Sequence, residues 1–214
     1  MDHMAPPKLG VAAGYALAAL CLVYAAVLAI GLYTLSSPDQ QIQQPWFACM
    51  EILILAIAPL AVALMVALYA WAPDERRSIA LLGIAFMSMC AVVTCSVHFV
   101  ILTLSRHPII AAFPWAPTVF SFQWPSLAYA LDILAWDVFF PFAALCAALT
   151  VPGPGLAYGA RSLFFASAAF SLLGLAGVPL GNMNVRNMGI VGYVVLFPVA
   201  AVLMAVLFQR DAAK

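Results

Sequence analysis

Charge is scarce in this chain of 214 residues. It has eight Lys and Arg against eight Asp and Glu, so only 7% of its residues are charged. A soluble domain usually carries about 25% charged residues, so this chain has too few to cover a soluble globule. The net charge of zero also argues against a nucleic-acid partner, which basic patches would attract. Disorder is excluded because 67% of the residues are hydrophobic.

Catalytic and cofactor motifs are also lacking. The sequence has no Gly-x-Ser-x-Gly, no Walker loop and no His-Glu-x-x-His, so no enzyme class is indicated. The lysines are Lys8 and Lys214, neither of which is placed to bind retinal within a span. Among the three histidines, His98 alone lies well inside an apolar stretch, which makes a haem with two histidine ligands a weak hypothesis. The sequence therefore assigns no cofactor.

Long apolar runs take the place of these features. A bilayer core about 30 Å thick needs about 20 apolar helical residues. The runs predict an all-α integral membrane protein, a six-transmembrane-helix bundle forming one polytopic domain over residues 1–214. A signal peptide is disfavoured, because the first apolar run is longer than the usual h-region of roughly 7–15 residues. We found no internal repeat of the kind that many transporters contain. The predicted helices are 11–35, 46–71, 79–104, 125–150, 162–180 and 188–208.

Positive charges in short loops predict the orientation, since they favour the cytoplasmic side. With six spans, the two termini and the second and fourth loops share one side. The other side holds Arg106 and Arg186. We therefore expect both termini in the cytoplasm and the protein in a bacterial cytoplasmic (inner) membrane. The residues on the richer side are Lys8, Arg76, Arg77, Arg161, Arg210 and Lys214.

Ionisable residues inside the spans fall in the outer half of the predicted bundle. At 1.5 Å per residue, Glu51 lies roughly 8 Å below the start of its helix and Asp132 roughly 10 Å below the start of its own. His98 lies in the last third of the third helix, so it shares this layer. Asp137 is deeper, roughly 18 Å from the start. Intramembrane charges usually face the bundle interior or a wet cavity, so we expect a polar pocket open to the outer side with Asp137 at its floor.

The two aspartates should not share one face of a regular helix. Asp132 and Asp137 are five residues apart, which places them about 140° apart at 100° per residue. One of them is then expected to line the pocket while the other meets a neighbouring helix. Carboxyl groups inside a membrane often exchange protons or bind cations. The alternative is a protonated carboxyl group hydrogen-bonded across helices, for example to Asn182 or a serine.

Two further sites have weaker support. His98, Glu51 and Asp132 form a plausible set of metal ligands, although no helical ligand spacing supports it. Arg186 and Asn182 lie in the predicted turn between the last two helices. They are candidates to bind an anionic headgroup or a substrate carboxylate on the outer face. They are equally suited to cap the ends of those helices.

The preferred hypothesis is binding or translocation of a small solute or proton through the outer pocket. Asp137 would be the main group, with Asp132, Glu51 and His98 beside it. The expected partners are the lipid bilayer and a small-molecule or ion ligand, with no nucleic acid. An intramembrane enzyme or redox-linked protein acting on a lipid or quinone-like substrate is the alternative. An accessory subunit, in which the polar groups only join helices, is another.

Overall fold

The computed structural model describes residues 6–36 and 40–213, and these residues form helices joined by loops without any strand. Six helices within this part of the chain are long and apolar enough to cross a membrane. Two of the six, the fourth and the sixth, are interrupted by π-helical segments. The elements are α1 (Pro6–Tyr33), α2 (Trp46–Trp71), η1 (Asp74–Arg76), α3 (Arg77–Leu104), α4 (Pro108–Ala111), α5 (Ala116–Val119), α6 (Leu127–Ile133), η2 (Leu134–Phe139), α7 (Phe140–Thr150), α8 (Leu156–Leu175), α9 (Met183–Arg186), α10 (Met188–Ile190), η3 (Val191–Leu196) and α11 (Phe197–Ala212).

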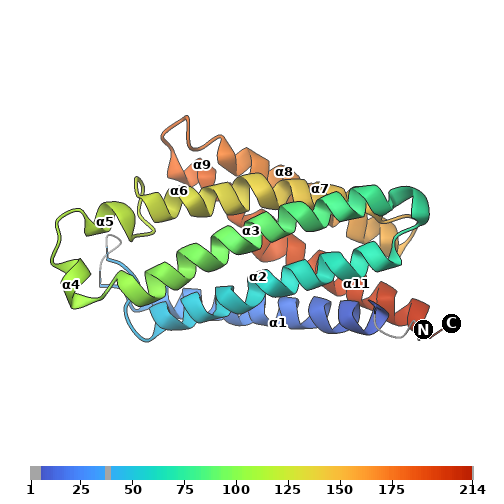
Figure 1. The fold of residues 1–214 in the computed structure, drawn as a ribbon, viewed down its shortest axis with the longest axis horizontal. Helices are drawn as coiled ribbons and strands as arrows, with labels where there is room; N and C mark the ends of the chain where they lie inside the picture. Colours follow the sequence, from blue (N-terminus) through green and yellow to red (C-terminus); the bar gives the residue numbers. More distant parts are fainter. Residues whose placement is uncertain (1–5, 37–39, 214) are drawn as a thin grey trace.

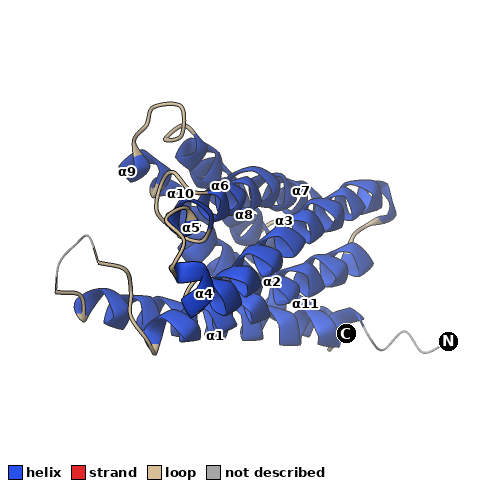
Figure 2. Cartoon of the chain, turned by 60° about the vertical axis from the view of Figure 1, so that its left-hand side comes forward, coloured by secondary structure: helices blue, strands red, loops and turns tan. Residues whose placement is uncertain are grey.

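The long helices form a closed ring in chain order. Each packs on the next, and α11 returns to pack on α1 (Figure 1). The start of α1 and the end of α11 lie at one end of the bundle, here called the terminal end. The short helices α4, α5 and α9 lie at the opposite end, here called the loop end (Figures 1 and 2). A hydrogen bond from Trp71 to Asp211, 2.7 Å long, joins α2 to α11 at the terminal end.

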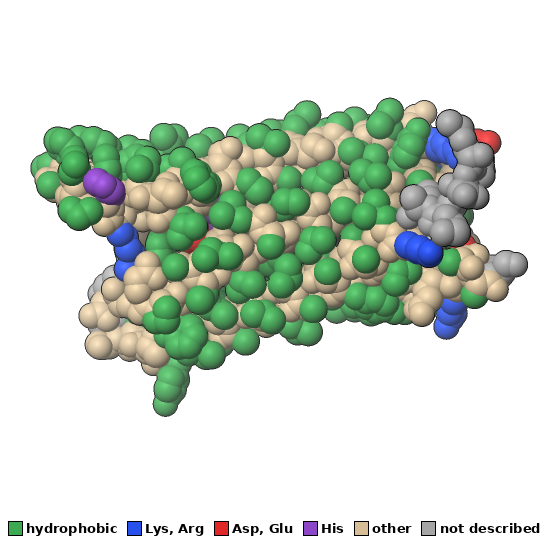
Figure 3. All heavy atoms as spheres, turned by 60° about the horizontal axis from the view of Figure 1, so that its bottom comes forward, with side chains coloured by type: hydrophobic (Ala, Val, Ile, Leu, Met, Phe, Trp, Pro, Cys, Tyr) green, Lys and Arg blue, Asp and Glu red, His purple; other side chains and the backbone are tan. Residues whose placement is uncertain are grey.

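Charged side chains gather near the two ends of the bundle, and its middle is covered by apolar ones (Figure 3). The Lys and Arg residues predicted to share one side include Arg76, Arg161 and Arg210, which lie near the terminal end. Lys214, counted with them, lies outside the described residues. Arg106 follows α3 at the loop end, where its guanidinium donates to the Ile42 carbonyl.

The fifth long helix differs from its expected range at both ends. The fifth long helix runs from Leu156 to Leu175, whereas the sequence predicted 162–180. The sequence predicts a start after Arg161 because charged residues usually lie outside membrane-spanning helices. Instead, Arg161 lies on the helix surface with its guanidinium 5.2 Å from the centre of the Tyr158 ring. The helix can begin directly after Gly155, whose φ of +65° suits glycine.

Two π-helical segments, η2 and η3, interrupt the fourth and sixth spans. Each is followed by Phe-Pro, with Pro141 or Pro198 as the second residue of the next helix. Proline lacks an N–H, and its ring clashes with the carbonyl four residues earlier. A π turn, whose hydrogen bonds span five residues, relieves this conflict. The Phe140 N–H accordingly donates to the Ala135 carbonyl rather than to a carbonyl four residues away.

These two interrupted helices are a local repeat that the sequence analysis missed. Both contain Phe-Pro-x-Ala-Ala, at 140–144 and at 197–201. Corresponding residues meet: the rings of Trp136 and Tyr193 are 5.0 Å apart, as are those of Phe140 and Phe197. The repeat was overlooked because it covers half of each helix rather than a three-helix unit.

Small side chains line the helix contacts of the terminal half. Fully buried alanines follow each Phe-Pro pair, and their size lets the backbones approach closely. Gly14 makes one of these close contacts on α1. A Cβ atom there would lie 2.7 Å from the Ala201 carbonyl oxygen and 2.9 Å from the Ala205 Cβ.

We predict that Gly14→Leu destabilises the bundle by forcing α1 away from α11. Overpacking of this kind costs about 1–3 kcal/mol. Thermal unfolding of the purified protein in detergent would measure it as a lower Tm than the parent's. Ala19→Leu, at an exposed position of the same helix, is the control and should leave Tm unchanged. Equal Tm values for the two variants would show that the α1–α11 contact is not close-packed.

Candidate functional site

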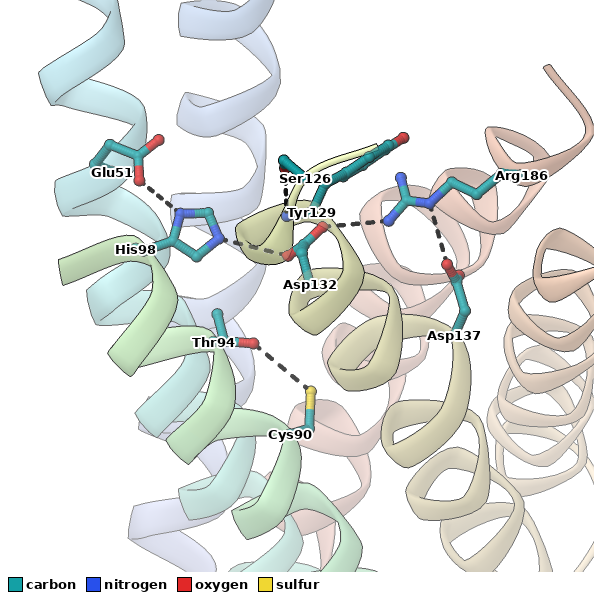
Figure 4. Close-up of polar contacts among 9 residues, drawn as sticks. All are labelled: Glu51, Cys90, Thr94, His98, Ser126, Tyr129, Asp132, Asp137 and Arg186. Carbon is teal, nitrogen blue, oxygen red and sulfur yellow. Dashed lines mark hydrogen bonds and ion pairs between the residues drawn. The ribbon is translucent and has the colours of Figure 1, made fainter. Parts of the chain in front are cut away.

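Five ionisable side chains from four long helices meet in the loop half of the bundle (Figure 4). We call them the charged network. Four of them are almost completely buried, and the fifth, Asp132, has a side chain that is 14% exposed. The network consists of Glu51 of α2, His98 of α3, Asp132 of α6, Asp137 of η2 and Arg186 of α9.

His98 lies between two carboxyl groups. Its Nδ1 is 2.7 Å from Glu51 Oε2, and its Nε2 is 3.6 Å from Asp132 Oδ1. A ring with a proton on both nitrogens can donate to both carboxylates. The Phe122 ring lies over the imidazole, with ring centres 4.9 Å apart. The three groups predicted to share one layer therefore do meet.

Arg186 lies between the carboxyl groups of Asp132 and Asp137. Its Nε donates to Asp137 Oδ2 over 3.1 Å, and its terminal nitrogen donates to Asp132 Oδ2 over 3.2 Å. Its guanidinium also lies 5.0 Å from the centre of the Tyr129 ring, within the range of a cation–π contact. Asp132 thus connects the histidine part of the network to the arginine part.

Both aspartates contact the same guanidinium, contrary to the expectation that they would face about 140° apart on a regular helix. The reason is η2, which begins between them. In a π-helix the hydrogen bonds join residues five apart, so residues at that spacing stack on one face. The interruption before Pro141 therefore turns Asp132 and Asp137 toward one partner.

Arg186 is the residue of the charged network whose place differs most from that expected from the sequence. It was expected in a turn on the outer face, but it is only 3% exposed and lies in the first turn of the last span. Two glycines make this possible: a Cβ on Gly174, near the end of α8, or on Gly177, in the turn that follows, would collide with the backbone at Arg186. The Gly174-x-x-Gly177 spacing was the signal in the sequence for this close approach.

Asn182 does not join the network. Its side chain is the N-cap of α9 and accepts from the N–H groups of Asn184 and Val185. Of the two roles foreseen for it, the capping one is therefore the role seen. Asp137 is hydrogen-bonded to Arg186 and not to Asn182.

Metal binding has little geometric support. Within the described ranges, no group of three or more His, Cys, Asp or Glu side chains is arranged to hold a metal ion. Glu51, His98 and Asp132 are close together, but each imidazole nitrogen already faces a carboxylate oxygen. A metal needs a nitrogen lone pair directed at it. The chemistry of these three residues is therefore that of a hydrogen-bonded chain.

Two cavities border the network. The deep cavity has a volume of about 220 Å³ and is lined by residues of five of the six spans, including Glu51, His98, Asp132 and Arg186. The loop cavity, about 240 Å³, lies nearer the loop end beside Gln40, Gln41 and Gln123. Three residues line both cavities and form the partition between them: Met50, Glu51 and Phe122.

The network carries more negative groups than positive ones. It holds three carboxyl groups against one guanidinium and one imidazole. Even a positively charged imidazole leaves one carboxylate uncompensated. A buried uncompensated charge is costly, so the arrangement favours one further proton or a bound cation.

Comparisons of this chain with protein-family models, with curated proteins and with solved structures find no match. Two buried side-chain atoms, Asp137 Oδ1 and Ser171 Oγ, have no hydrogen-bond partner among the described residues. Asp137, which was expected at the floor of the pocket, joins the network through Arg186 but lines neither of the two cavities.

We predict that Arg186→Gln strongly destabilises the protein because it leaves two buried carboxylates without their cation. Breaking a buried ion pair from one side costs about 3–5 kcal/mol. Unfolding in mixed micelles titrated with SDS would measure the loss. Arg161→Gln, which changes a partly exposed arginine, is the control and should have little effect.

The pairing itself can be isolated by a double-mutant cycle with Asp137→Asn. The double variant should be more stable than the sum of the two single losses implies, with a coupling of roughly 0.5–3 kcal/mol. Strict additivity would mean that Arg186 and Asp137 do not depend on each other.

Proposed function

We propose that this protein is a multi-pass membrane protein that binds a small solute or a proton at the charged network and carries it across the bilayer. The observation that carries the proposal is the excess of carboxyl groups in a buried network that borders a cavity. Such a network changes its charge when it gains or loses a proton. A solute bound in the adjoining cavity would experience that change in charge. Six helices of membrane-spanning length and composition provide the setting.

Asp137 is the central proton-carrying group in this proposal. Its Oδ2 is held by Arg186, whereas its Oδ1 is buried without a partner among the described residues. Gly189 packs against that oxygen so closely that a Cβ there would be 2.5 Å away. A proton on Oδ1 would remove the charge that the network cannot otherwise balance. Arg186 and Asp132 then relay this change to His98 and Glu51.

The proposed route starts at the loop end. The loop cavity is lined by exposed glutamines, and the partition residues separate it from the deep cavity. Glu51 belongs to both the partition and the network, so a solute or proton passing the partition meets a carboxyl group at once. Asp137 lies at the far end of the same chain of contacts.

The proposed orientation places the terminal end in the cytoplasm and the loop end outside. The support is the bias of Lys and Arg toward the terminal end. We place the protein in a bacterial cytoplasmic membrane, with all 214 residues forming a single polytopic domain. In this arrangement the cavities open away from the cytoplasm.

We predict that proteoliposomes containing this protein take up protons when a pH gradient is imposed. With valinomycin and potassium to compensate charge, a trapped pH dye should report uptake faster than in empty vesicles. Asp137→Asn should insert normally and lower the rate at least about tenfold. Glu75→Gln, at an exposed carboxyl group near the terminal end, is the matched control. Rates equal to those of empty vesicles, or an Asp137→Asn rate equal to the parent's, would exclude proton translocation through Asp137.

The orientation can be tested with single cysteines in a background whose native cysteines are replaced. In bacterial cells, an impermeant maleimide that passes only the outer membrane should label Gln123→Cys and leave Glu75→Cys unlabelled. Both positions are exposed, at opposite ends of the bundle. Labelling of Glu75→Cys alone would reverse the proposed orientation. Disrupting the cells should make both positions reactive.

A further inference from the structure

The deep cavity is amphipathic. One wall is the charged network, from Glu51 through His98 and Asp132 to Arg186 (Figure 4). The remaining lining is apolar or aromatic and comes largely from α1, α2 and the last span. An inorganic ion would make no favourable contact with these apolar walls. The lining instead fits a molecule with one polar end and one apolar end.

The charges at the polar wall select for a positive ligand. Arg186 is already neutralised by Asp132 and Asp137, so it has little attraction left for an anion. Among the described residues the charged partner of Glu51 is His98, which is shared with Asp132. Glu51 meets His98 through Oε2, so Oε1 takes no part in that contact, and the side chain is 4% exposed. This oxygen belongs to a residue that lines both cavities.

Aromatic rings around the cavity reinforce this selection. Five aromatic side chains contribute to the lining, and the faces of such rings attract ammonium groups. Cation–π contacts are strongest for desolvated cations, which is the condition of a ligand in this cavity. The rings belong to Tyr24, Phe122, Tyr129, Trp136 and Tyr193.

The size of the cavity limits the ligand. Its volume of about 220 Å³ lies below the roughly 300–1,000 Å³ of sites for drug-sized ligands. A molecule the size of a simple aromatic amine fits this limit. The loop cavity supplies a polar approach to it, since Gln40, Gln41 and Gln123 can solvate an ammonium group before it reaches Glu51.

We propose that the deep cavity binds a small organic cation, an ammonium group attached to a compact apolar or aromatic body. The ammonium group pairs with Glu51 beside His98, and the apolar body lies against Tyr24, Leu28 and Trp136. This rests on the proposed function in that it names the class of solute for the same cavity. The cation supplies the positive charge that the network lacks.

Three probes of matched shape test the charge selection: 2-phenylethylammonium, 2-phenylethanol and 3-phenylpropionate. Calorimetric titration of the purified protein in lipid nanodiscs should show binding of the ammonium probe. The alcohol should bind at least about tenfold more weakly, and the carboxylate should show no binding. Equal affinity for the alcohol, tighter binding of the carboxylate, or no binding of the ammonium probe would each overturn the proposal.

Two variants test where the probe binds. Glu51→Gln should weaken 2-phenylethylammonium at least about tenfold, with Glu75→Gln as the unchanged control. Leu28→Trp fills the cavity from α1 without altering any charge and should abolish binding. Leu22→Trp is its matched control, because Leu22 is 73% exposed on the same helix. Undiminished binding by Leu28→Trp would place the probe outside the deep cavity even if Glu51→Gln failed to fold.

The liposome assay separates this inference from the proposed function. Proton uptake without ammonium binding would overturn the organic-cation ligand and leave proton transfer standing. Ammonium binding without proton uptake would do the reverse: the chain would be an organic-cation binding protein that carries no protons. Each result is obtained on the same purified preparation.

Discussion

The contact of one guanidinium with two carboxyl groups is the interaction on which the site depends. Taking an ion out of water costs several kcal/mol, and only well-placed partners offset that cost. Arg186 is buried where Asp132 and Asp137 both reach it. The fourth and sixth spans are thereby fixed to each other in the loop half. Asp132 then extends the same charge balance to His98 and to Glu51 across the bundle.

The backbone supplies this geometry through two uncommon features. The π-helical segment before Pro141 brings two aspartates to one face of the fourth span. Gly174 of α8 and Gly177 in the following turn let α9 approach closely enough for its arginine to enter the bundle. π-Helical turns within α-helices occur frequently at functional sites. Here the turn has a direct chemical result, because it doubles the number of carboxyl groups that one cation can hold.

Much of the fold could be predicted from composition, because long apolar runs leave few alternatives to membrane-length helices. The meeting of Glu51, His98 and Asp132 could also be predicted, since depth along a helix follows from residue number. The place of Arg186 could not be obtained this way. A charged residue in a sequence normally marks the end of a span, so Arg186 is expected in a turn. The rule fails here because Arg186 is paired with two carboxyl groups inside the bundle.

The direction of Asp137 was missed for a different reason. A face is assigned from a fixed angle per residue, and a π turn changes that angle within the helix. Proline is the visible cause, but proline also occurs inside α2, at Pro59, where the helix remains α-helical. What distinguishes the fourth and sixth spans is their mutual contact through Trp136 and Tyr193. That contact is tertiary, so it is absent from a reading of single helices.

The alanines after the two Phe-Pro pairs belong to the tightly packed terminal half of the bundle. Ala143 and Ala144 on α7 and Ala200 and Ala201 on α11 are completely buried. Large side chains of the same half, such as Leu68 and Phe208, are buried beside the helices that carry these alanines. Small and large residues together fill the space between the helices beneath the cavities. Passage of a solute through this half therefore requires packed side chains or whole helices to move.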